Sequence, residues 1–372
     1  MTDTSFFEHI TQQFDDALPF VAYRKPNSKL LQGFYQEDDH IHYSLDFIES
    51  GFVFAPFDNT KKSVIIPDTY NINCAYSVTE NIQDISEVVL PQEEVFHEQQ
   101  HLELVQKGIL KINEGGLKKV VLSRKRTFPN ALTDPIAVFK KLLHAYSAAF
   151  VYIWYHPKIG LWLGATPETL LEIKNRTLHT MSLAGTQRYT ASNVTWGTKE
   201  KEEQQLVTDT IASRLDPFIK ELFIGEIENH KAGNLLHLKT PISGKIDETA
   251  VPLKEVINAL HPTPAVCGLP VEDAKEFIIK NENYDRSYYT GFLGELNLKN
   301  ESSRATSRRN VENLAYRSIK KSTHLFVNLR CMEHTAAGIQ IYVGGGITSA
   351  SIPEDEWEET RHKLETMGKV LF

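Results

Sequence analysis

Apolar side chains recur at helical spacing in the second quarter of the chain. Over residues 95–114 they form one stripe, made of Leu102, Val105, Ile109 and Ile112. This spacing predicts an amphipathic helix, and the glycine pair that follows it is typical of a helix end. A second helix is predicted to begin at Asp134, because an Asp-Pro pair there precedes another apolar stripe.

Other stretches carry the pattern of strands. Residues 119–124 are apolar apart from their ends, which predicts a buried strand that begins with Lys119. An isolated lysine in this place also fits a side chain that reaches out to solvent. Further strands are predicted over residues 150–155, 160–163, 235–241, 288–294, 325–330 and 339–343. The first two and the last two of these have the spacing of hairpins.

The first quarter of the chain has a weaker pattern. Short pieces such as Phe52-Val53-Phe54 and Val64-Ile65-Ile66 stand between polar turns and predict short strands. We therefore expect residues 1–94 to form a divergent N-terminal portion that packs on a core of residues 95–372. The length of 372 residues allows either two domains or one large one.

One charge stands where an apolar residue is expected. A long helix is predicted over residues 198–222, with Val207, Ile211 and Leu215 at steps of four. One step back lies Glu203, so this carboxylate heads the side that faces the core. A buried carboxylate is costly unless it is paired or metal-bound. By contrast, Glu200 and Glu202 lie off the stripe and are expected in solvent.

The chain near its end combines glycines with charges. A turn is predicted at the three glycines from Gly344 to Gly346, where backbone N–H groups can approach an anion closely. Ser351 and Glu354 have capping-box spacing, which predicts a helix start. The helix would carry Glu356, Glu359 and Lys363 on one side, and on their own Glu359 and Lys363 also fit an ordinary surface ion pair.

Four further positions are candidates for a site. Glu168 follows a strand and a proline turn, a rigid place for an acid, although turns often carry exposed glutamates. Gly185 and Thr186 end a strand in a tight turn. His237 alternates with apolar neighbours, which is also usual for a core histidine. Residues 260–268 contain two prolines and a glycine, and rigid loops of this sort often line sites.

The composition of the chain limits the classes of partner that we expect it to bind. The chain is 41% hydrophobic and 24% charged, as in ordinary globular proteins. Its formal net charge is −8, which argues against nucleic acid or an acidic membrane surface as the partner. No apolar run approaches the length of a membrane span. An anionic substrate would need a local cluster of cations.

The cysteines and the N-terminus indicate the compartment. Cys74, Cys267 and Cys331 are odd in number and far apart, which argues against a disulfide framework and against a zinc site. The first residues lack the basic and apolar regions of a signal peptide. We therefore expect a cytoplasmic protein, and we expect it to act as a monomer.

Several short patterns occur together in one order. They are Lys119-Val-Val-Leu-Ser-Arg124, Gly164-Ala-Thr-Pro-Glu168, Leu183-Ala-Gly-Thr186, Glu203 at its helix start, His261-Pro-Thr-Pro-Ala-Val-Cys-Gly268, Leu329-Arg-Cys331 and the segment from Gly344 to Lys363. As a set, over residues 95–372, they resemble the chorismate-utilising enzymes, and within them most of all the isochorismate synthases. The resemblance implies an α+β fold of large antiparallel sheets flanked by helices, with the site between the sheets.

The resemblance also implies a reaction. In the isochorismate synthases, water adds at C2 of chorismate while the C4 hydroxyl leaves, and the reaction depends on Mg²⁺. By matching, Lys119 would be the general base and Glu168 the general acid, while Glu203 and Glu359 would bind the metal. The groups that hold chorismate would be Gly185, Thr186, His237, Ala265, Arg330, Gly344 and Lys363.

The residue chemistry agrees with this assignment. Chorismate carries two carboxylates. A guanidinium such as that of Arg330 can hold one of them with two hydrogen bonds. Mg²⁺ favours oxygen ligands and can bridge the other to two glutamates. Lys119 would have to lose its proton to act as a base, and burial beside other cations favours that loss.

Related activities stay open as alternatives. The relatives that make anthranilate or aminodeoxychorismate share a Pro-Ile-x-Gly-Thr pattern, whereas this chain has Ser182-Leu-Ala-Gly-Thr186. They also usually have threonine in place of Ala265, and both differences favour water as the nucleophile. A salicylate synthase, which goes on to eliminate pyruvate, and a catalytically silent binding protein are further alternatives.

Two features depart from the family pattern. Gln204 stands where many relatives have a histidine after the metal-binding glutamate, which bears on the geometry of the metal site. Residues 299–321 form a long polar and basic insertion, which we interpret as a solvated surface loop.

Overall fold

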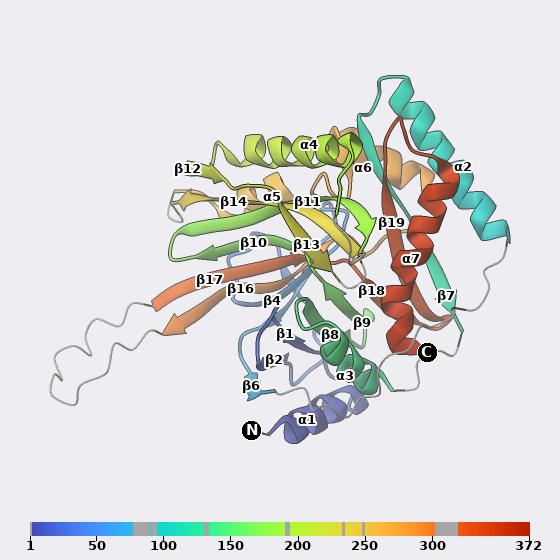
Figure 1. Ribbon diagram of the computed structural model, residues 1–372. Helices are drawn as coiled ribbons and strands as arrows, with labels where there is room; N and C mark the ends of the chain where they lie inside the picture. The colour runs from blue at the N-terminus through green and yellow to red at the C-terminus, as the bar shows by residue number, and fades with distance from the viewer. Residues whose placement is uncertain are drawn as a thin grey trace.

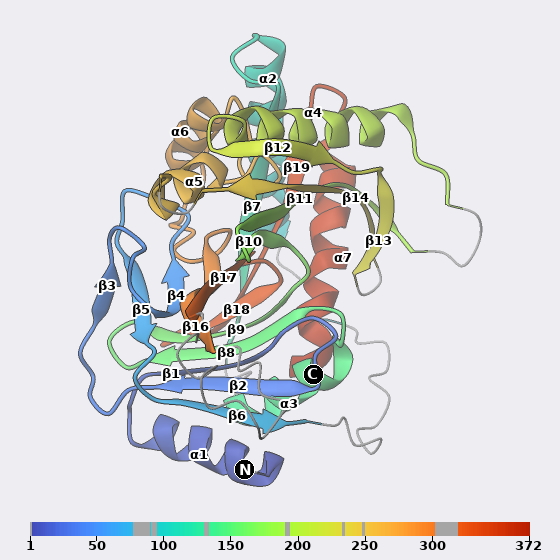
Figure 2. The ribbon, with the colours of Figure 1, turned by 90° about the vertical axis from the view of Figure 1, so that its left-hand side faces the viewer.

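Two large antiparallel sheets make up the centre of the protein (Figures 1 and 2). The structure is a computed structural model and describes residues 2–76, 90, 95–129, 134–189, 194–232, 235–247, 250–301 and 319–372. In this part of the chain, every strand pairing is antiparallel.

One edge strand of the nine-stranded sheet comes from the C-terminal half of the chain, and the strands at the other edge come from its N-terminal part. In spatial order it contains β15 (Gly268–Leu269), β7 (Lys119–Phe128), β19 (Gly338–Ile347), β18 (Cys331–Thr335), β9 (Gly160–Thr166), β8 (Phe150–His156), β1 (Phe20–Arg24), β2 (Leu30–Tyr35) and β6 (Asn71–Ala75). Strands far apart in sequence are therefore neighbours.

The ten-stranded sheet also places strands side by side that are far apart in sequence. Its spatial order is β12 (Ile219–Ile224), β14 (Leu235–Ile246), β11 (Thr177–Arg188), β10 (Thr169–Lys174), β17 (Ile319–Val327), β16 (Phe292–Glu301), β4 (Gly51–Ala55), β5 (Ser63–Pro67) and β3 (His42–Ser44), and β13 (Glu228–Ala232) also pairs with β14. Both sheets thus receive strands from the first quarter of the chain. The division into residues 1–94 and 95–372 stays a prediction.

Helices cover the outer faces. They are α1 (Asp3–Asp15), α2 (Val95–Asn113), α3 (Pro135–Ala145), α4 (Thr198–Leu215), α5 (Leu253–Leu260), α6 (Val271–Asn281) and α7 (Pro353–Leu371). α4 packs on β11 and β14 of the ten-stranded sheet, whereas α7 packs on β19 of the nine-stranded one (Figure 1). The predicted α+β fold with helices flanking large antiparallel sheets is confirmed.

Aromatic rings join the two sheets. Phe150 of β8 stacks on Phe326 of β17 with ring centroids 4.2 Å apart. Phe54 of β4 lies 4.9 Å from Trp154 of β8, also between centroids. Such pairs contribute about 0.5–1.5 kcal/mol each beyond the burial of their area. The aromatic layer therefore fixes one sheet relative to the other.

Several predicted elements are confirmed, and one helix was predicted too long. α2 and the first turn of α3 lie where the pattern placed them, and the side chain of Asp134 accepts hydrogen bonds from the first N–H groups of α3. The helix predicted over residues 198–222 ends at Leu215, and β12 begins at Ile219. Pro217 explains the difference, because proline cannot continue a helix.

The hairpin predicted from residues 325–330 and 339–343 is wrong. β17 lies in the ten-stranded sheet, and β19 forms its hairpin with β18 instead. Between them the chain crosses from one sheet to the other, and Arg330 stands at this crossing with a φ of 48°. Hairpin spacing alone does not report a change of sheet.

Three further boundaries differ from the prediction. The strand predicted over residues 288–294 begins only at Phe292. The three glycines lie within β19 rather than in a turn. α7 has no side-chain cap, since the Ser351 hydroxyl donates to Glu356 (Oγ to Oε1, 2.6 Å). Of the insertion predicted over residues 299–321, residues 302–318 lie outside the described part of the chain.

A buried ion pair ties the strand that carries Lys119 to a neighbouring loop. Arg286 and Glu282 are both almost fully buried, and Arg286 Nη2 lies 2.6 Å from Glu282 Oε1. The same guanidinium donates to the carbonyl of Val121 on β7 and to that of Val266. Glu282 in turn accepts from the N–H of Ser123. This network holds the end of β7 in place.

Replacing Arg286 by methionine should therefore lower the free energy of unfolding by about 3–5 kcal/mol, because Glu282 would keep a buried, unpaired charge. Urea denaturation measures this change. The matched control is Lys245→Ala, which removes an exposed pair with Glu221 and should change stability by no more than about 1 kcal/mol. A similarly small loss in Arg286→Met would contradict the argument.

Candidate active site

A pocket of about 200 Å³ lies between the two layers, at the crossing that carries Arg330. It brings together every residue that the sequence predicted for the site, namely Lys119, Glu168, Gly185, Thr186, Glu203, His237, Ala265, Arg330, Gly344, Glu359 and Lys363. These residues come from both sheets and from α4 and α7. The structure thus places the predicted residues in one cavity, while their roles stay predictions.

Lys119 begins β7 and faces α4 across the pocket. Its side chain is 2% exposed, and its Nζ atom lies 2.7 Å from Oε1 of Glu203. The interpretation of Lys119 as a side chain that reaches solvent is therefore wrong. Glu203 also occupies the inward position that the helical stripe predicted, and the cost of bringing its charge inside is offset by the lysine.

Glu168 is a buried acid in the lining of the same pocket. It follows β9 and Pro167, and its carbonyl accepts from the N–H of Val327 on β17. Burial raises the pKa of the Glu168 carboxyl to about 8, with the charge of Lys119 opposing this rise. At neutral pH the carboxyl is therefore mostly protonated and has a proton to donate.

A chain of hydrogen bonds orients Arg330. Its Nη2 donates to Nε2 of His237 (3.0 Å). A guanidinium can only donate, so Nε2 of His237 is an acceptor and the ring proton lies on Nδ1, which is 3.2 Å from the carbonyl of Gly185. Burial, followed by the charge of Arg330, keeps the pKa of His237 well below its usual value. His237 is thus neutral and serves to fix the guanidinium.

A second cation lies on α7. Lys363 Nζ is 2.6 Å from Oε1 of Glu359 and 2.7 Å from the carbonyl oxygen of Gly344. The ion pair that was predicted between Glu359 and Lys363 is present, but both residues line the pocket. Lys363 is therefore held at the cavity wall by a charge and by a strand backbone.

The glycines of β19 leave room for these charged groups. A Cβ atom on Gly346 would lie 3.0 Å from Cε of Lys119 and 3.1 Å from Oε1 of Glu203. A Cβ atom on Gly345 would lie 3.1 Å from Oε2 of Glu356 and 3.7 Å from Oε1 of Glu359. The strand can thus approach carboxylates that any side chain would displace.

Sequence reasoning gave no role to two carboxylates of this pocket, although it placed Glu356 on the same side of its helix as Glu359. Glu200 was expected in solvent, yet it lines the cavity, whereas Glu202 is exposed as predicted. Glu356 is buried and also lines the cavity. Both stand three residues before a predicted ligand, Glu203 or Glu359, and residues three apart share a helix face. That spacing was a signal that could have found them.

Among the residues that the structure describes, no group of three or more His, Cys, Asp or Glu side chains stands close enough to hold a metal ion. Two carboxylates are instead taken up by lysines, as described for Glu203 and Glu359. In the same part of the chain, no helix is long and apolar enough to cross a membrane.

Comparisons with known proteins identify the family of the chain. A family model described as chorismate binding enzyme matches residues 59–307, which is more than half of the chain. A second model with this description matches residues 314–369. The chain belongs to the chorismate-binding enzymes. The family resemblance that the sequence patterns indicated is therefore confirmed.

Two of the similar proteins are named isochorismate synthases. The isochorismate synthase DhbC of Bacillus subtilis is 29% identical over 287 residues, which cover 72% of this chain and 66% of DhbC. The isochorismate synthase MenF of Pasteurella multocida is 30% identical over 280 residues, covering 72% of this chain and 59% of MenF. The chain thus spans less than two thirds of the length of these relatives.

A solved structure shows the same fold. The crystal structure of DhbC from Bacillus anthracis matches with a TM-score of 0.76 at 22% identity, and the match covers 98% of this chain and 99% of that one. The fold of this chorismate-binding enzyme is thereby established over nearly its whole length.

A methyl group on Gly346 should disturb the pocket without unfolding the protein. Gly346→Ala would press on Lys119 and Glu203, and we expect kcat/KM for chorismate consumption to fall at least about tenfold, equivalent to about 1.4 kcal/mol. Steady-state kinetics checks this. Gly116→Ala is the control, because its new Cβ would meet mainly the flexible end of Lys111 and should leave kcat/KM unchanged. Equal rates in both variants would contradict the tight fit at Gly346.

Proposed function

We propose that this chorismate-binding enzyme is an isochorismate synthase, an isomerase that adds water at C2 of chorismate while the C4 hydroxyl leaves. One observation carries the proposal: a buried lysine and a buried, protonated carboxyl face the same pocket. The named relatives from Bacillus subtilis and Pasteurella multocida support it.

Glu168 is suited to be the general acid. A hydroxyl leaves poorly as hydroxide, so it has to receive a proton as its bond to C4 breaks. The Glu168 carboxyl holds that proton at neutral pH because its pKa is raised to about 8. General acid catalysis of this kind typically contributes about 10²–10⁴-fold in rate.

Lys119 is suited to be the general base. To take a proton from the water that attacks C2, it has to be an uncharged amine. It therefore first has to lose its own proton, which the charge of Glu203 opposes while the two are paired. Its pairing with Glu203 holds Nζ at the wall of the pocket, and its burial keeps other water away. After turnover the proton passes to solvent and Glu168 regains its own, so no net proton is consumed.

The two carboxylates of chorismate need cations. Arg330, fixed by His237, can fork onto one of them. Lys363 and the backbone near Gly344 offer a second anion site. Gly185, Thr186 and Ala265 complete the proposed contacts, and the small side chain of Ala265 leaves room for water as the nucleophile.

Magnesium belongs to the proposal. The donor atoms fit it, because Mg²⁺ takes carboxylate oxygens, usually one or two from the protein, and keeps several waters. Glu203 and Glu359 would hold the ion, with Glu200 and Glu356 beside them in the lining of the pocket. When bound, the ion would supply positive charge for a substrate carboxylate.

Location and assembly are part of the same proposal. The three cysteines are all buried free thiols, which supports a reducing, cytoplasmic setting. A monomer is proposed because each group assigned above comes from a single chain.

The test is to incubate the purified protein with chorismate and Mg²⁺ and to identify the products by mass and fluorescence. We expect isochorismate without pyruvate. In parallel, Lys119→Ala should lower kcat at least about 10²-fold while chorismate still binds, because the base is lost and the anion sites remain. Calorimetric titration measures the binding.

Other products would decide against the proposal. Salicylate with pyruvate would indicate a salicylate synthase, and amination in the presence of ammonia would indicate an aminating relative. Binding without turnover would indicate a silent binding protein. Near-normal turnover by Lys119→Ala would remove Lys119 from its role.

The raised pKa of Glu168 predicts a pH dependence. The protonated carboxyl is the active form, so kcat/KM should fall as the pH rises through about 8. A pH series of steady-state rates measures this alkaline limb. Glu168→Gln should remove turnover at every pH, since an amide has no proton to give. Rates that continue to rise above pH 9 would contradict the assignment.

A further inference from the structure

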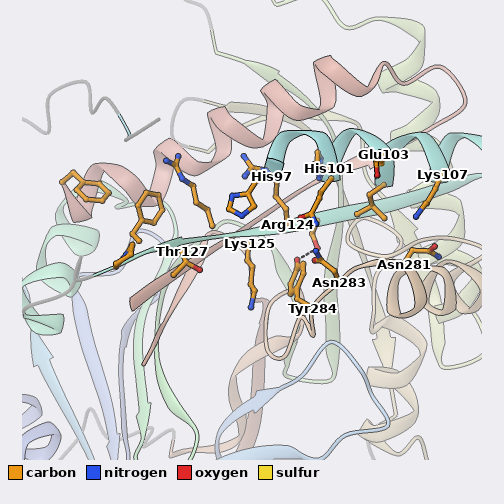
Figure 3. A pocket seen from close by; sticks show the side chains of 17 residues that line it. His97, His101, Glu103, Lys107, Arg124, Lys125, Thr127, Asn281, Asn283 and Tyr284 are labelled. Atoms are coloured by element: carbon orange, nitrogen blue, oxygen red, sulfur yellow. Dashed lines mark hydrogen bonds between the residues drawn. The ribbon is translucent and has the colours of Figure 1, made fainter. Parts of the chain in front are cut away.

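A groove larger than the active-site pocket lies along one edge of the nine-stranded sheet. Figure 3 shows it between α2 and the outer edge of β7. Its volume is about 650 Å³, and its walls are the side of α2 from His97 to Lys107 and the loop from Asn281 to Tyr284. The groove shares no lining residue with the pocket of Lys119 and Glu168.

The floor of this groove is an open strand edge. β15 pairs with β7 only at Lys119 and Val120. The next two outward positions are satisfied, because the N–H of Val121 donates to the carbonyl of Cys267 and the N–H of Ser123 donates to Glu282.

Alternate residues of a strand point their N–H and C=O groups to the same edge, so Lys125 and Thr127 continue this row. Both residues are exposed. In the described part of the chain, no strand pairs with β7 on this side beyond Val120. Unpaired edges of this kind accept an added strand.

Charges lie on both faces of this edge. Side chains alternate along a strand, so Lys125 and Thr127 project to one face of the sheet and Arg126 to the other. Lys107 adds a cation from α2. Cations on two opposite faces do not converge on one small anion. They flank a line, which suits an extended ligand that runs along the strand.

The charges of the side chains that line the groove indicate which kind of ligand it can bind. Among the described residues that line the groove, Lys107, Lys125 and Arg126 are cations and Glu103 is the one acid. Arg124 lines it too, but its buried guanidinium donates to Thr360 of α7. Burial, together with the charge of Arg124, lowers the pKa of His101 to about 3, so this histidine is neutral. The groove is thus positive although the whole chain has a formal charge of −8. Electrostatic complementarity therefore favours an acidic ligand.

One buried polar atom also lacks a partner. His101 is 3% exposed and lines the groove from α2, and its Nδ1 atom has no hydrogen-bond partner among the described residues. Buried polar groups are normally hydrogen-bonded, so this unpaired atom is an exception at the groove wall.

From these observations we propose that the groove is a docking site for an acidic, extended segment of a partner protein, which adds to the edge of β7 as a further strand. The backbone groups of Lys125 and Thr127 form the ladder, and Lys107 and Lys125 hold acidic side chains. The site lies apart from the pocket, so a partner can dock while chorismate enters.

The experiment is a selection of nine-residue peptides from a random library against the purified full-length protein. We expect enrichment of acidic peptides with strand-forming residues, and slower amide exchange at Lys125 and Thr127 on binding. Backbone N-methylation at alternate residues of a selected peptide keeps its charge but blocks the ladder, and it should weaken binding at least about tenfold.

Protein variants separate the two parts of the proposal. Thr127→Pro removes one outward N–H, and Lys125→Glu reverses a charge, and each should weaken peptide binding at least about tenfold. Lys111→Glu, on α2 but outside the groove, is the matched control and should bind normally. Chorismate turnover should be unchanged in all three, because none of these residues lines the active-site pocket.

Several outcomes would overturn the proposal. One is a selection without enrichment, which would mean that the charges merely block the edge. Others are basic peptides as winners, or binding that neither Lys125→Glu nor N-methylation weakens. If Thr127→Pro does not fold, Lys125→Glu and the methylated peptides still decide the question.

Discussion

The ion pair of Lys119 and Glu203 is the contact on which the site depends. Lys119 belongs to β7 of the nine-stranded sheet, whereas Glu203 belongs to α4, which packs on the ten-stranded sheet. The pair therefore bridges the two layers that the pocket separates. Either charge left alone in this place would cost about 3–5 kcal/mol, so the two walls are held at the distance at which the charges meet.

The same pocket keeps another carboxyl in the opposite state. Burial raises the pKa of Glu168 to about 8, with the more distant charge of Lys119 opposing it, whereas Glu203 and Glu359 each meet a lysine at hydrogen-bond distance. Environments that push acids apart in this way assign them different tasks. Glu168 can donate a proton at neutral pH, while Glu203 and Glu359 each lie beside a cation.

A run of three glycines in β19, from Gly344 to Gly346, makes this arrangement possible. Gly345 and Gly346 lie in β19 between the carboxylates of α7 and the ion pair of Lys119, and a Cβ atom at either position would come within 3.1 Å of these groups. The charged side chains are therefore packed against the backbone of β19. The groove along β7 uses the other side of the neighbouring strand and leaves this packing untouched.

Local patterns predicted what depends on local sequence. The helical stripe found α2 and placed Glu203 inward, and the strand pattern placed Lys119 at the start of β7. Partners far apart in sequence were not encoded locally. The strand before Arg330 was therefore paired with the wrong neighbour, since nothing near it reports that the chain changes sheets there.

The site itself was found through several weak patterns taken together. Each of them alone had an ordinary structural explanation. Glu200 was wrongly expected in solvent because it lies off the apolar stripe of its helix, whereas Glu356 was placed beside Glu359 without a role. The glycines were interpreted as a turn because their strand is paired with β7, more than two hundred residues earlier in the chain.

The central claim is that water from the solvent adds at C2 of chorismate while the C4 hydroxyl leaves. The most direct measurement is the reaction of chorismate in water enriched in oxygen-18, with the product analysed by mass spectrometry and NMR. The account predicts isochorismate that carries one oxygen-18 atom, bound at C2. Isochorismate without the label would mean that the hydroxyl migrates within the substrate, and it would contradict the division of labour between Lys119 and Glu168.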